Sequence, residues 1–460
     1  MEKQLPKNWI ETDLFTIANV STGKKDANHA KEDGEYVFYT CALEQTKSPT
    51  YSFEGPSIIV PGNGNIGYVF YYEGKFEAYQ RTYVINDIKI NQKYLYYHFK
   101  SFWKSRTVDN LFGSTIQYVK IGNFKSYQVA FPPLAEQNRI VVKLDTLFAQ
   151  LETIKASMAK IPVLLKEFRQ QVLTQAVTGK LTEEWRKGKE LEDSSTILNG
   201  IEKRRRKVAS PTLLKKLDEI YNDKSLSIKY NLPSNWSEIN LDKVCEKFSY
   251  GTSTKSDDDG EFVVLRMGNL QNGKIDWSDL KYTSDIDEYE KYKLKKGDVL
   301  FNRTNSPELV GKTSIYEGEK DSIYAGYLIK IWNYEELDSY FLNFVMNSDF
   351  VKKWCWEVKS DGVSQSNINA QKLSKLTIPF PSLIEQQEIV SRVESLFAKA
   401  DAIEQQYQAL KEKIDTLPQA LLHKALKGEL TKQLESDGDA RELLKQIQEL
   451  KKSTIKSKRK

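Results

Sequence analysis

Residues Phe131–Ile154 read FPPLAEQNRIVVKLDTLFAQLETI, and residues Phe380–Ile403 read FPSLIEQQEIVSRVESLFAKADAI. Eleven of these 24 positions are identical. The register then holds without a gap to AVTGKLT from Ala176 and ALKGELT from Ala425. Similarity of this length within one chain indicates an internal duplication. We therefore predict two copies of one structural unit.

The beginning of each copy carries a second shared motif. PKNW at 6–9 returns as PSNW at 233–236. The two copies are 227 residues apart at the tryptophan and 249 apart at the long segment, so the block between the motifs is 22 residues longer in the second copy. A weaker similarity, between residues 195–205 and 440–450, extends the repeat. The copies share their ends and differ in their middles.

The shared segment has the periodicity of a coiled coil. Apolar residues recur at alternating spacings of four and three, from Ile140 to Val172 and again from Ile389 to Leu421. A strict 3.5-residue repeat makes a narrow apolar seam that requires a facing helix. The predicted seam residues are Ile140, Leu144, Leu147, Leu151, Ile154, Ile161, Leu165, Ile389, Val393, Leu396, Ile403, Leu410, Ile414 and Leu417.

We predict that these two helical arms pair with each other. Because both arms follow their blocks in the same chain order, antiparallel pairing would relate the copies by a pseudo-twofold axis. Ordinary core packing in a helical bundle is the alternative. Pro162 and Pro418 predict a kink or a break in each arm, and Gly179 and Gly428 predict helix ends.

The blocks between the shared motifs have the pattern of α+β domains. Short strand-like runs are cut by glycine, as in GPSIIVPGNGNIGYVFYY from Gly55 and GDVLFNRTNS from Gly297. The predicted fold class is α+β, with two α/β domains separated by a pair of long antiparallel coiled-coil helices. The predicted boundaries are a first domain at 1–132, a central arm at 133–181, a charged, partly helical linker at 182–232, a second domain at 233–381, a distal arm at 382–431, and a C-terminal helix with a basic tail at 432–460.

Composition excludes several classes of protein. The chain of 460 residues is 40% hydrophobic and 12% aromatic, which argues against wholesale disorder. The net charge of +5 does not by itself indicate a nucleic-acid binder. Three scattered cysteines and three scattered histidines predict no metal site and a reducing compartment. No apolar leader or span of about 18 apolar residues is present, so we expect a cytoplasmic protein without membrane contact.

Some motifs resemble catalytic or cofactor sites, but the sequence around them does not have the pattern that such sites require. GNGNIG at 62–67 matches a dinucleotide fingerprint, but a strand-like YVFYY follows it where a helix is required. A tight turn is the better interpretation. The sequence also lacks the Asp/Asn-Pro-Pro-aromatic tetrad of amino-methyltransferases and a convincing nuclease motif. We therefore predict no catalytic residues and expect a binding protein or a scaffold.

These motifs together resemble the specificity subunit of type I restriction–modification systems. The resemblance rests on PxNW, GDVLFNRTNS, GVSQSNIN and above all F-P-x-L-x-E-Q followed by the arm, and it covers nearly the whole chain. It implies two target-recognition domains that each read one half of a bipartite, asymmetric site on double-stranded DNA, with the paired arms as a spacer.

The resemblance also implies partners. Two methyltransferase (modification) subunits would dock on the arms, for which we favour the polar faces of residues 136–160 and 385–410. Two restriction (translocase/nuclease) subunits would complete the complex. The specificity chain itself would bind no cofactor directly, because S-adenosylmethionine belongs to the modification subunits and ATP with Mg²⁺ to the restriction subunits.

Base reading in the major groove needs forked donors and amides on loops, with Arg pairing to guanine and Asn or Gln to adenine. Turn geometry, phosphate contact and internal hydrogen bonds are the alternative roles for the same side chains. The candidate DNA-binding residues are Asn63, Asn65, Arg81, Lys104, Arg106 and Gln117 in the first block, and Arg266, Asn269, Asn302, Arg303, Asn305, Ser364, Gln365 and Asn367 in the second.

Two other functions remain open at this point. A single-chain DNA methyltransferase or endonuclease would transfer methyl groups or cut without added subunits, although the missing tetrad disfavours it. A coiled-coil scaffold without DNA binding would show no sequence preference.

Overall fold

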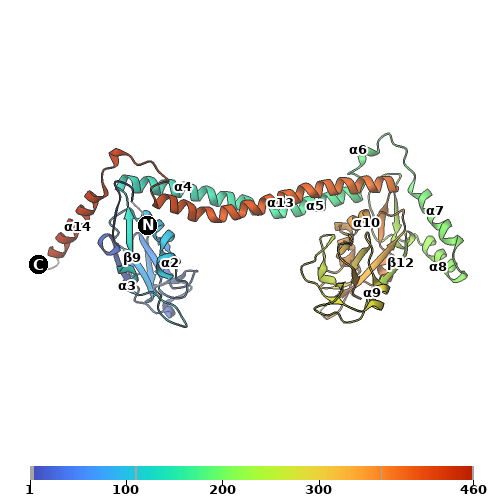
Figure 1. Ribbon diagram of the computed structural model, residues 1–460, viewed down its shortest axis with the longest axis horizontal. Helices are drawn as coiled ribbons and strands as arrows, with labels where there is room; N and C mark the ends of the chain where they lie inside the picture. The colour runs from blue at the N-terminus through green and yellow to red at the C-terminus, as the bar shows by residue number, and fades with distance from the viewer. Residues whose placement is uncertain (1–4, 109–110, 364, 458–460) are drawn as a thin grey trace. The chain divides into compact units, whose positions relative to one another are not determined.

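The computed structural model describes residues 5–108, 111–363 and 365–457, with side chains to 453. The chain forms two compact units (Figure 1). The first unit comprises the residues up to Ala159 together with those from Tyr407 onward, and the second comprises Lys160–Gln406. Each unit therefore combines a block from one copy of the repeat with a helical segment from the other.

The first unit contains a small α+β domain. An antiparallel sheet has the order β2-β9-β6-β7, and a second sheet has the order β4-β3-β8-β5 with β3 and β8 parallel. A two-stranded ribbon, β1-β10, lies beside the arm. The strands are β1 (Ile10–Asp13), β2 (Asn19–Thr22), β3 (Tyr36–Tyr39), β4 (Thr46–Ser48), β5 (Phe53–Glu54), β6 (Ser57–Pro61), β7 (Phe70–Tyr72), β8 (Lys75–Ala78), β9 (Thr82–Asn86) and β10 (Gln128–Phe131), and the helices are α1 (Leu14–Ile17), η1 (Ala27–His29), α2 (Gln92–Thr107) and α3 (Ile121–Lys125).

The second unit repeats this plan. Its four-stranded sheet has the order β12-β21-β17-β19, its three-stranded sheet has the order β16-β13-β20 with β13 and β20 parallel, and β11-β24 forms the ribbon. The strands are β11 (Ser237–Asn240), β12 (Cys245–Tyr250), β13 (Phe262–Leu265), β14 (Leu270–Gln271), β15 (Lys274–Ile275), β16 (Tyr282–Thr283), β17 (Val299–Asn302), β18 (Thr304–Asn305), β19 (Thr313–Ile315), β20 (Ser322–Tyr324), β21 (Leu328–Asn333), β22 (Ser360–Asp361), β23 (Ser366–Asn367) and β24 (Thr377–Phe380), and the helices are η3 (Leu241–Lys243), η4 (Met267–Asn269), α9 (Ile286–Tyr292), α10 (Ser339–Met346), α11 (Asp349–Val358) and α12 (Ala370–Ser374).

The strand register confirms the internal repeat. Ile10 pairs with Phe131 in the first ribbon, and Ser237 pairs with Phe380 in the second. These partners are related by the same displacements of 227 and 249 residues that align the motifs. The two blocks therefore share one topology, although their sequences differ.

The arms are α4 (Leu134–Met158) with α5 (Ile161–Val177), and α13 (Leu383–Leu426). In the first unit, Ile140 and Leu144 near the start of α4 share a core with Leu422 and Leu426 near the end of α13. In the second unit, Val172 at the end of α5 shares a core with residues at the start of α13. The arms are therefore antiparallel within each unit, which confirms the predicted pairing.

The two prolines have different effects. Pro162 lies in the first turn of α5, after a break that ends α4 at Met158, as predicted. Pro418 lies inside α13, which continues to Leu426. A break at Pro418 was therefore the wrong alternative. Ile414 before the proline and Leu422 and Leu426 after it are buried, and this packing on both sides of Pro418 holds the helical turns together.

Burial along the seam is uneven. Ile140, Leu144, Ile389 and Val393 belong to the packed core of a unit, whereas Leu151, Leu165 and Ile414 are buried outside these cores. Buried seam residues are Ile140, Leu144, Leu151, Leu165, Ile389, Val393 and Ile414, half-buried ones are Leu147, Ile161 and Leu396, and exposed ones are Ile154, Ile403, Leu410 and Leu417.

Helices after the arms complete the repeat. In the second unit α5 is followed by α6 (Glu183–Arg186), α7 (Ser194–Lys207) and α8 (Pro211–Asn222), and in the first α13 is followed by η5 (Glu435–Asp437) and α14 (Ala440–Ser457). Ile201 of α7 and Ile447 of α14 are both buried in their unit's core. Ser194 N donates to Asn235 O, as Ala440 N does to Asn8 O, so the helices align one residue away from the register read from sequence.

The arginine run of α7 has internal partners. Arg204 pairs with Glu336, and Arg206 pairs with Glu202 and Asp218. Arg205 Nη1 donates to Asp242 O at 2.8 Å. These contacts favour a structural role for the run over contact with phosphate.

Candidate nucleic-acid interface

The two motifs that recur in both copies, PxNW and F-P-x-L-x-E-Q, form a joint between domain and arm in each unit. Trp9 Nε1 donates to Glu136 Oε2 at 3.2 Å, and Trp236 Nε1 donates to Glu385 Oε2 at 2.8 Å. All four side chains are buried. PxNW and the Glu of F-P-x-L-x-E-Q therefore recur together because they bond to each other.

The glutamine of the same motif anchors one helix of the domain core. Gln137 Oε1 accepts from the backbone N–H of Asn91, the N-cap of α2, at 2.8 Å. Gln386 Oε1 accepts from the N–H of Asp338, the N-cap of α10, also at 2.8 Å. The arm thus fixes the position of a domain helix through one buried amide in each copy.

The helix-ending glycines complete the joint. Gly179 and Gly428 have φ of +71° and +74°, a left-handed conformation that favours glycine. A Cβ on Gly179 would lie 2.6 Å from Pro233 Cγ, and one on Gly428 would lie 2.9 Å from Pro6 Cγ. The proline of PxNW therefore packs directly on the end of the other copy's arm.

The two joints differ in charge. In the second unit Glu385 Oε1 accepts from Thr182 Oγ1 at 2.7 Å and from Arg186 Nε at 2.8 Å. In the first unit Glu136 Oε1 is buried without a hydrogen-bond partner among the described residues. Burial raises the pKa of Glu136, and the Trp9 hydrogen bond opposes that rise.

Away from the joint, the first block gathers loops into what we call the first loop cluster, residues 62–68, 104–106 and 111–120. Asn63 forms a bridge with Tyr118 across two of these loops. Gly67 packs against the Lys104 side chain, since a Cβ there would lie 2.9 Å from Lys104 Cγ. Gln117 is exposed on the same loops. Three segments of the chain therefore reach one surface.

The second loop cluster comprises residues 303–309, 359–363 and 365–369. A three-stranded sheet with the order β18-β23-β22 joins the predicted motifs FNRTNS and GVSQSNIN. Asn367 Nδ2 donates to Thr304 Oγ1 at 2.8 Å. Gln365 is exposed, and Asn305 Oδ1 accepts from Ser306 N at 2.8 Å. Ser364 lies outside the described residues.

The two loop clusters occupy the same place in the repeat. Gly62 N donates to Arg81 O and Gly62 O accepts from Val119 N, while Arg303 makes the same two bonds with Tyr327 and Ile368. Val119 and Ile368 are 249 residues apart, the displacement of the arms. Sequence similarity does not reveal this correspondence, because the side chains at these positions differ.

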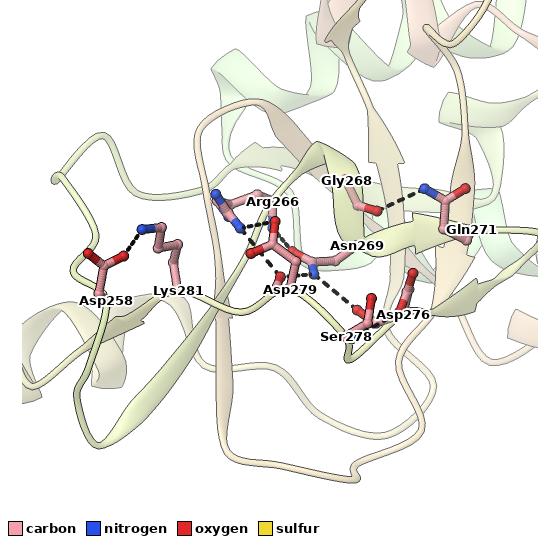
Figure 2. A network of polar contacts seen from close by, with 9 residues as sticks. All are labelled: Asp258, Arg266, Gly268, Asn269, Gln271, Asp276, Ser278, Asp279 and Lys281. Carbon is pink, nitrogen blue, oxygen red and sulfur yellow. Dashed lines mark hydrogen bonds and ion pairs between the residues drawn. The ribbon is translucent and has the colours of Figure 1, made fainter. Parts of the chain in front are cut away.

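Several of the predicted DNA-binding residues of the second block instead make hydrogen bonds and ion pairs inside that block. Figure 2 shows Arg266 and Asn269 directed at the loop of Asp276–Asp279. Arg266 Nη2 donates to Asp279 Oδ2 at 3.0 Å, and Asn269 Nδ2 donates to Asp279 O at 2.8 Å. Asn269 is buried, as is Asn302, whose Oδ1 accepts from Thr304 N at 3.3 Å. These contacts favour a structural role for the three residues.

Of the remaining cationic candidates, two have partners within the domain and two are exposed. Arg303 lies over the ring of Tyr250 at 4.7 Å and donates to Gly326 O at 3.4 Å, so it is held at the edge of the second loop cluster. Arg106 Nη1 donates to Gln128 O at 2.6 Å, which ties it to the domain. Arg81 and Lys104 are exposed.

Exposed apolar and aromatic side chains were missed as candidates. Tyr68 and Ile116 are exposed on the first loop cluster, and Tyr250 and Tyr327 are exposed beside the second. Lys120 Nζ lies 4.1 Å from the centre of the Phe112 ring. Aromatic residues inside glycine-rich loops were the available signal, but aromatic residues in the core have the same local pattern.

The described residues contain no group of three or more His, Cys, Asp or Glu side chains placed to hold a metal ion. Their helices are also each too short or too polar to cross a lipid bilayer.

Comparison with known proteins agrees with this architecture. The family model described as type I restriction modification DNA specificity domain matches residues 6–162 and 233–412. The EcoDI specificity subunit of Escherichia coli is 34% identical over 432 residues, covering 94% of this chain and 90% of that protein. The EcoBI specificity subunit of Escherichia coli is 28% identical over 93% of this chain and 87% of its own length.

Solved structures share the fold. A structure concerned with assembly and conformational transition of the type I restriction–modification system aligns with a TM-score of 0.61 at 16% identity, over 93% of this chain and 99% of that one. The HsdS subunit from Thermoanaerobacter tengcongensis aligns with a TM-score of 0.59 at 15% identity, with the same coverage. Taken with the family match, the duplicated joint and the paired arms, these findings show that the chain belongs to the family of DNA specificity subunits of type I restriction–modification systems, which are non-catalytic components of their complexes.

Proposed function

We propose that the chain reads a bipartite, asymmetric site on double-stranded DNA, with one half-site for each loop cluster. The target-recognition domains are residues 1–132 and 233–381, and the arms at 133–181 and 382–431 set the spacer between the half-sites. Residues 182–232 connect the copies, and residues 432–460 form a C-terminal helix with a basic tail after the second arm.

The observation that carries this proposal is the correspondence of the two loop clusters. They occupy the same backbone positions in both copies, as the bonds of Gly62 and Arg303 indicate, but they present different side chains. Equivalent placement with unlike chemistry suits a protein that reads two different half-sites, whereas an identical pair would suit a palindrome. Arg and amide side chains on loops are the groups that read base edges.

The arms also suit a spacer. A continuous helix of 44 residues such as α13 is about 66 Å long at about 1.5 Å per residue. The joints at Trp9 and Trp236 fix each domain to an arm by buried hydrogen bonds. The length of the arms would therefore set the distance between the two domains.

The proposed partners follow from the family, whose specificity subunits are non-catalytic components of their complexes. We place two modification subunits, which would bind S-adenosylmethionine and methylate adenine, on the outer faces of residues 136–160 and 385–410. Val142 is exposed there, outside the seam, and an exposed apolar residue on a helix is suited to a protein partner. Two restriction subunits with ATP and Mg²⁺ would add cleavage. Partners that enclose the duplex also supply phosphate contacts, which fits the chain's net charge of only +5.

Mapping of methylated adenines tests the proposal. A host that lacks other adenine methyltransferases would carry this chain with its modification subunit, and its genome would be read by long-read sequencing. We expect a motif of two defined half-sites separated by unspecified bases. The same host with the modification subunit alone is the control. A continuous or palindromic motif, or methylation that does not require this chain, would contradict the proposal.

A further inference from the structure

Each loop cluster contains a hairpin at the same position of the repeat. In the first copy Phe112 and Tyr118 exchange both backbone hydrogen bonds, at 3.0 and 2.8 Å. In the second copy Asp361 pairs with Ser366 and Ser360 pairs with Asn367 across the hairpin of β22 and β23, so its turn is one residue shorter than the turn of the first hairpin. Both hairpins turn at a glycine, Gly113 or Gly362, and these are 249 residues apart. The same displacement matches Ile116 with Gln365.

The hairpin of the first copy presents apolar side chains. Ile116 is 61% exposed, and the Phe112 and Tyr118 rings behind it are 5.9 Å apart. Lys120 Nζ lies 4.1 Å from the centre of the Phe112 ring at the base of the hairpin. Burying an exposed isoleucine under a ligand is favourable, because its apolar surface is then removed from water. The cation beside it suits an anionic ligand with an apolar contact point.

The hairpin of the second copy presents polar side chains. Gln365 is exposed, and its amide has no hydrogen-bond partner among the described residues. Asp361, the acid of this hairpin, is paired with Lys359 at 2.6 Å, and the Lys359 hydrogen bond lowers the pKa of that carboxyl. The charge of Asp361 is therefore balanced within the hairpin, which reduces its repulsion of phosphate.

We propose that Ile116 and Gln365 are equivalent specificity-determining residues, one for each half-site. This inference rests on the proposed function. Ile116 contacts the 5-methyl group of a thymine in the first half-site, because apolar side chains distinguish thymine by that methyl. Gln365 hydrogen-bonds the N6 and N7 edge of an adenine in the second half-site. A two-stranded ribbon of this kind is narrow enough to enter the major groove.

Reciprocal substitutions test the inference. Ile116→Gln and Gln365→Ile would each be combined with the modification subunits and used to methylate a library in which every position of the wild-type site is varied in turn. For Ile116→Gln we expect the preference for thymine at one position of the first half-site to fall at least about fivefold, the lower end of the discrimination given by a good base contact. For Gln365→Ile we expect the same loss for adenine in the second half-site.

Controls separate this inference from the function it rests on. Ile286→Gln changes an exposed isoleucine outside both loop clusters and should leave every base preference unchanged. If the wild-type chain shows no bipartite site, the proposed function fails. If the wild-type site is bipartite but neither variant alters the preference at any single position, the inference fails alone. A uniform loss of methylation on all sequences would assign these hairpins to a protein contact and would likewise overturn it.

Discussion

Arg186 Nε lies 2.8 Å from Glu385 Oε1, and this pair distinguishes the second joint from the first. Glu385 is fully buried and the Arg186 side chain is 17% exposed. The equivalent glutamate, Glu136, has one buried oxygen without a partner among the described residues. One substitution at the two equivalent positions should therefore have two different effects.

Glu385→Gln should destabilise the second unit by about 3 kcal/mol, because it leaves a largely buried guanidinium facing an amide N–H₂. Glu136→Gln should change stability by no more than about 1 kcal/mol, because it replaces a poorly solvated carboxyl by a neutral group that still accepts from Trp9. Hydrogen exchange of peptides around each joint measures both effects in the full chain. Equal destabilisation of the two joints would contradict the asymmetry.

Gly179→Ala should destabilise the second unit by at least about 1–2 kcal/mol. The left-handed conformation at Gly179 is costly for alanine, and its Cβ would lie 2.6 Å from Pro233 Cγ. Gly200→Ala is the matched control, because Gly200 lies within α7 and a Cβ there would meet no atom within 4 Å. That control should be neutral or stabilising by up to about 1 kcal/mol. Calorimetric unfolding of both variants checks the difference.

His98 predicts a loss of stability in mild acid. Burial lowers the pKa of His98 from 6.5 to about 3, and Arg106 adds to that effect. The folded state therefore holds His98 neutral, while the unfolded state takes up a proton below pH 6.5. The contribution of neutral His98 to the free energy of unfolding is fully present above pH 6.5. It is lost as the pH falls, and the loss is about 2 kcal/mol at pH 5. Urea unfolding should show this loss in the wild type, and His98→Gln should show a pH dependence smaller by that amount.

A chain that ends at Lys207 should self-associate. In the full chain, residues from Leu422 to Ile447 complete the core of the first domain. A chain of residues 1–207 lacks them but keeps their equivalents from Leu173 to Ile201, including the glycine on which PxNW packs. Each copy can supply these residues to a second copy. Sedimentation at micromolar concentration should give a dimer, and a stable folded monomer would contradict this expectation.

Much of the fold was predictable because repetition and periodicity are long-range signals. The duplicated F-P-x-L-x-E-Q segment predicted the arms, and the structure shows why: Glu136 and Gln137 each make a specific buried bond to the domain. The effect of Pro418 was not predictable, because packing on both sides of a proline decides whether the helix continues.

The side chains of the loop clusters were harder to assign. Asn269 and Gln365 both follow strand-like segments and glycine, yet Asn269 is buried in an internal network while Gln365 is exposed. An amide that stabilises a loop and an amide available to a base look alike in one sequence. Ile116 shows the converse, since this exposed apolar residue in a loop was not among the predicted candidates.

The central claim is that the paired arms set the distance between two half-sites. Arg169 Nη2 donates to Asp401 at 2.7 Å and to Glu404 at 2.8 Å, which identifies facing segments of the arms. Removing residues 166–172 together with the facing residues 399–405 takes one heptad from each arm, or about 10 Å of helix. That length corresponds to about three base pairs at about 3.4 Å each.

The deciding measurement is the motif of methylated adenines in a host that carries this doubly shortened chain with its modification subunit, compared with the wild-type motif. We expect both half-sites to keep their bases, with the spacer shortened by about three base pairs or with methylation of the original site lost. Retention of the original spacer, or altered bases in either half-site, would contradict the account.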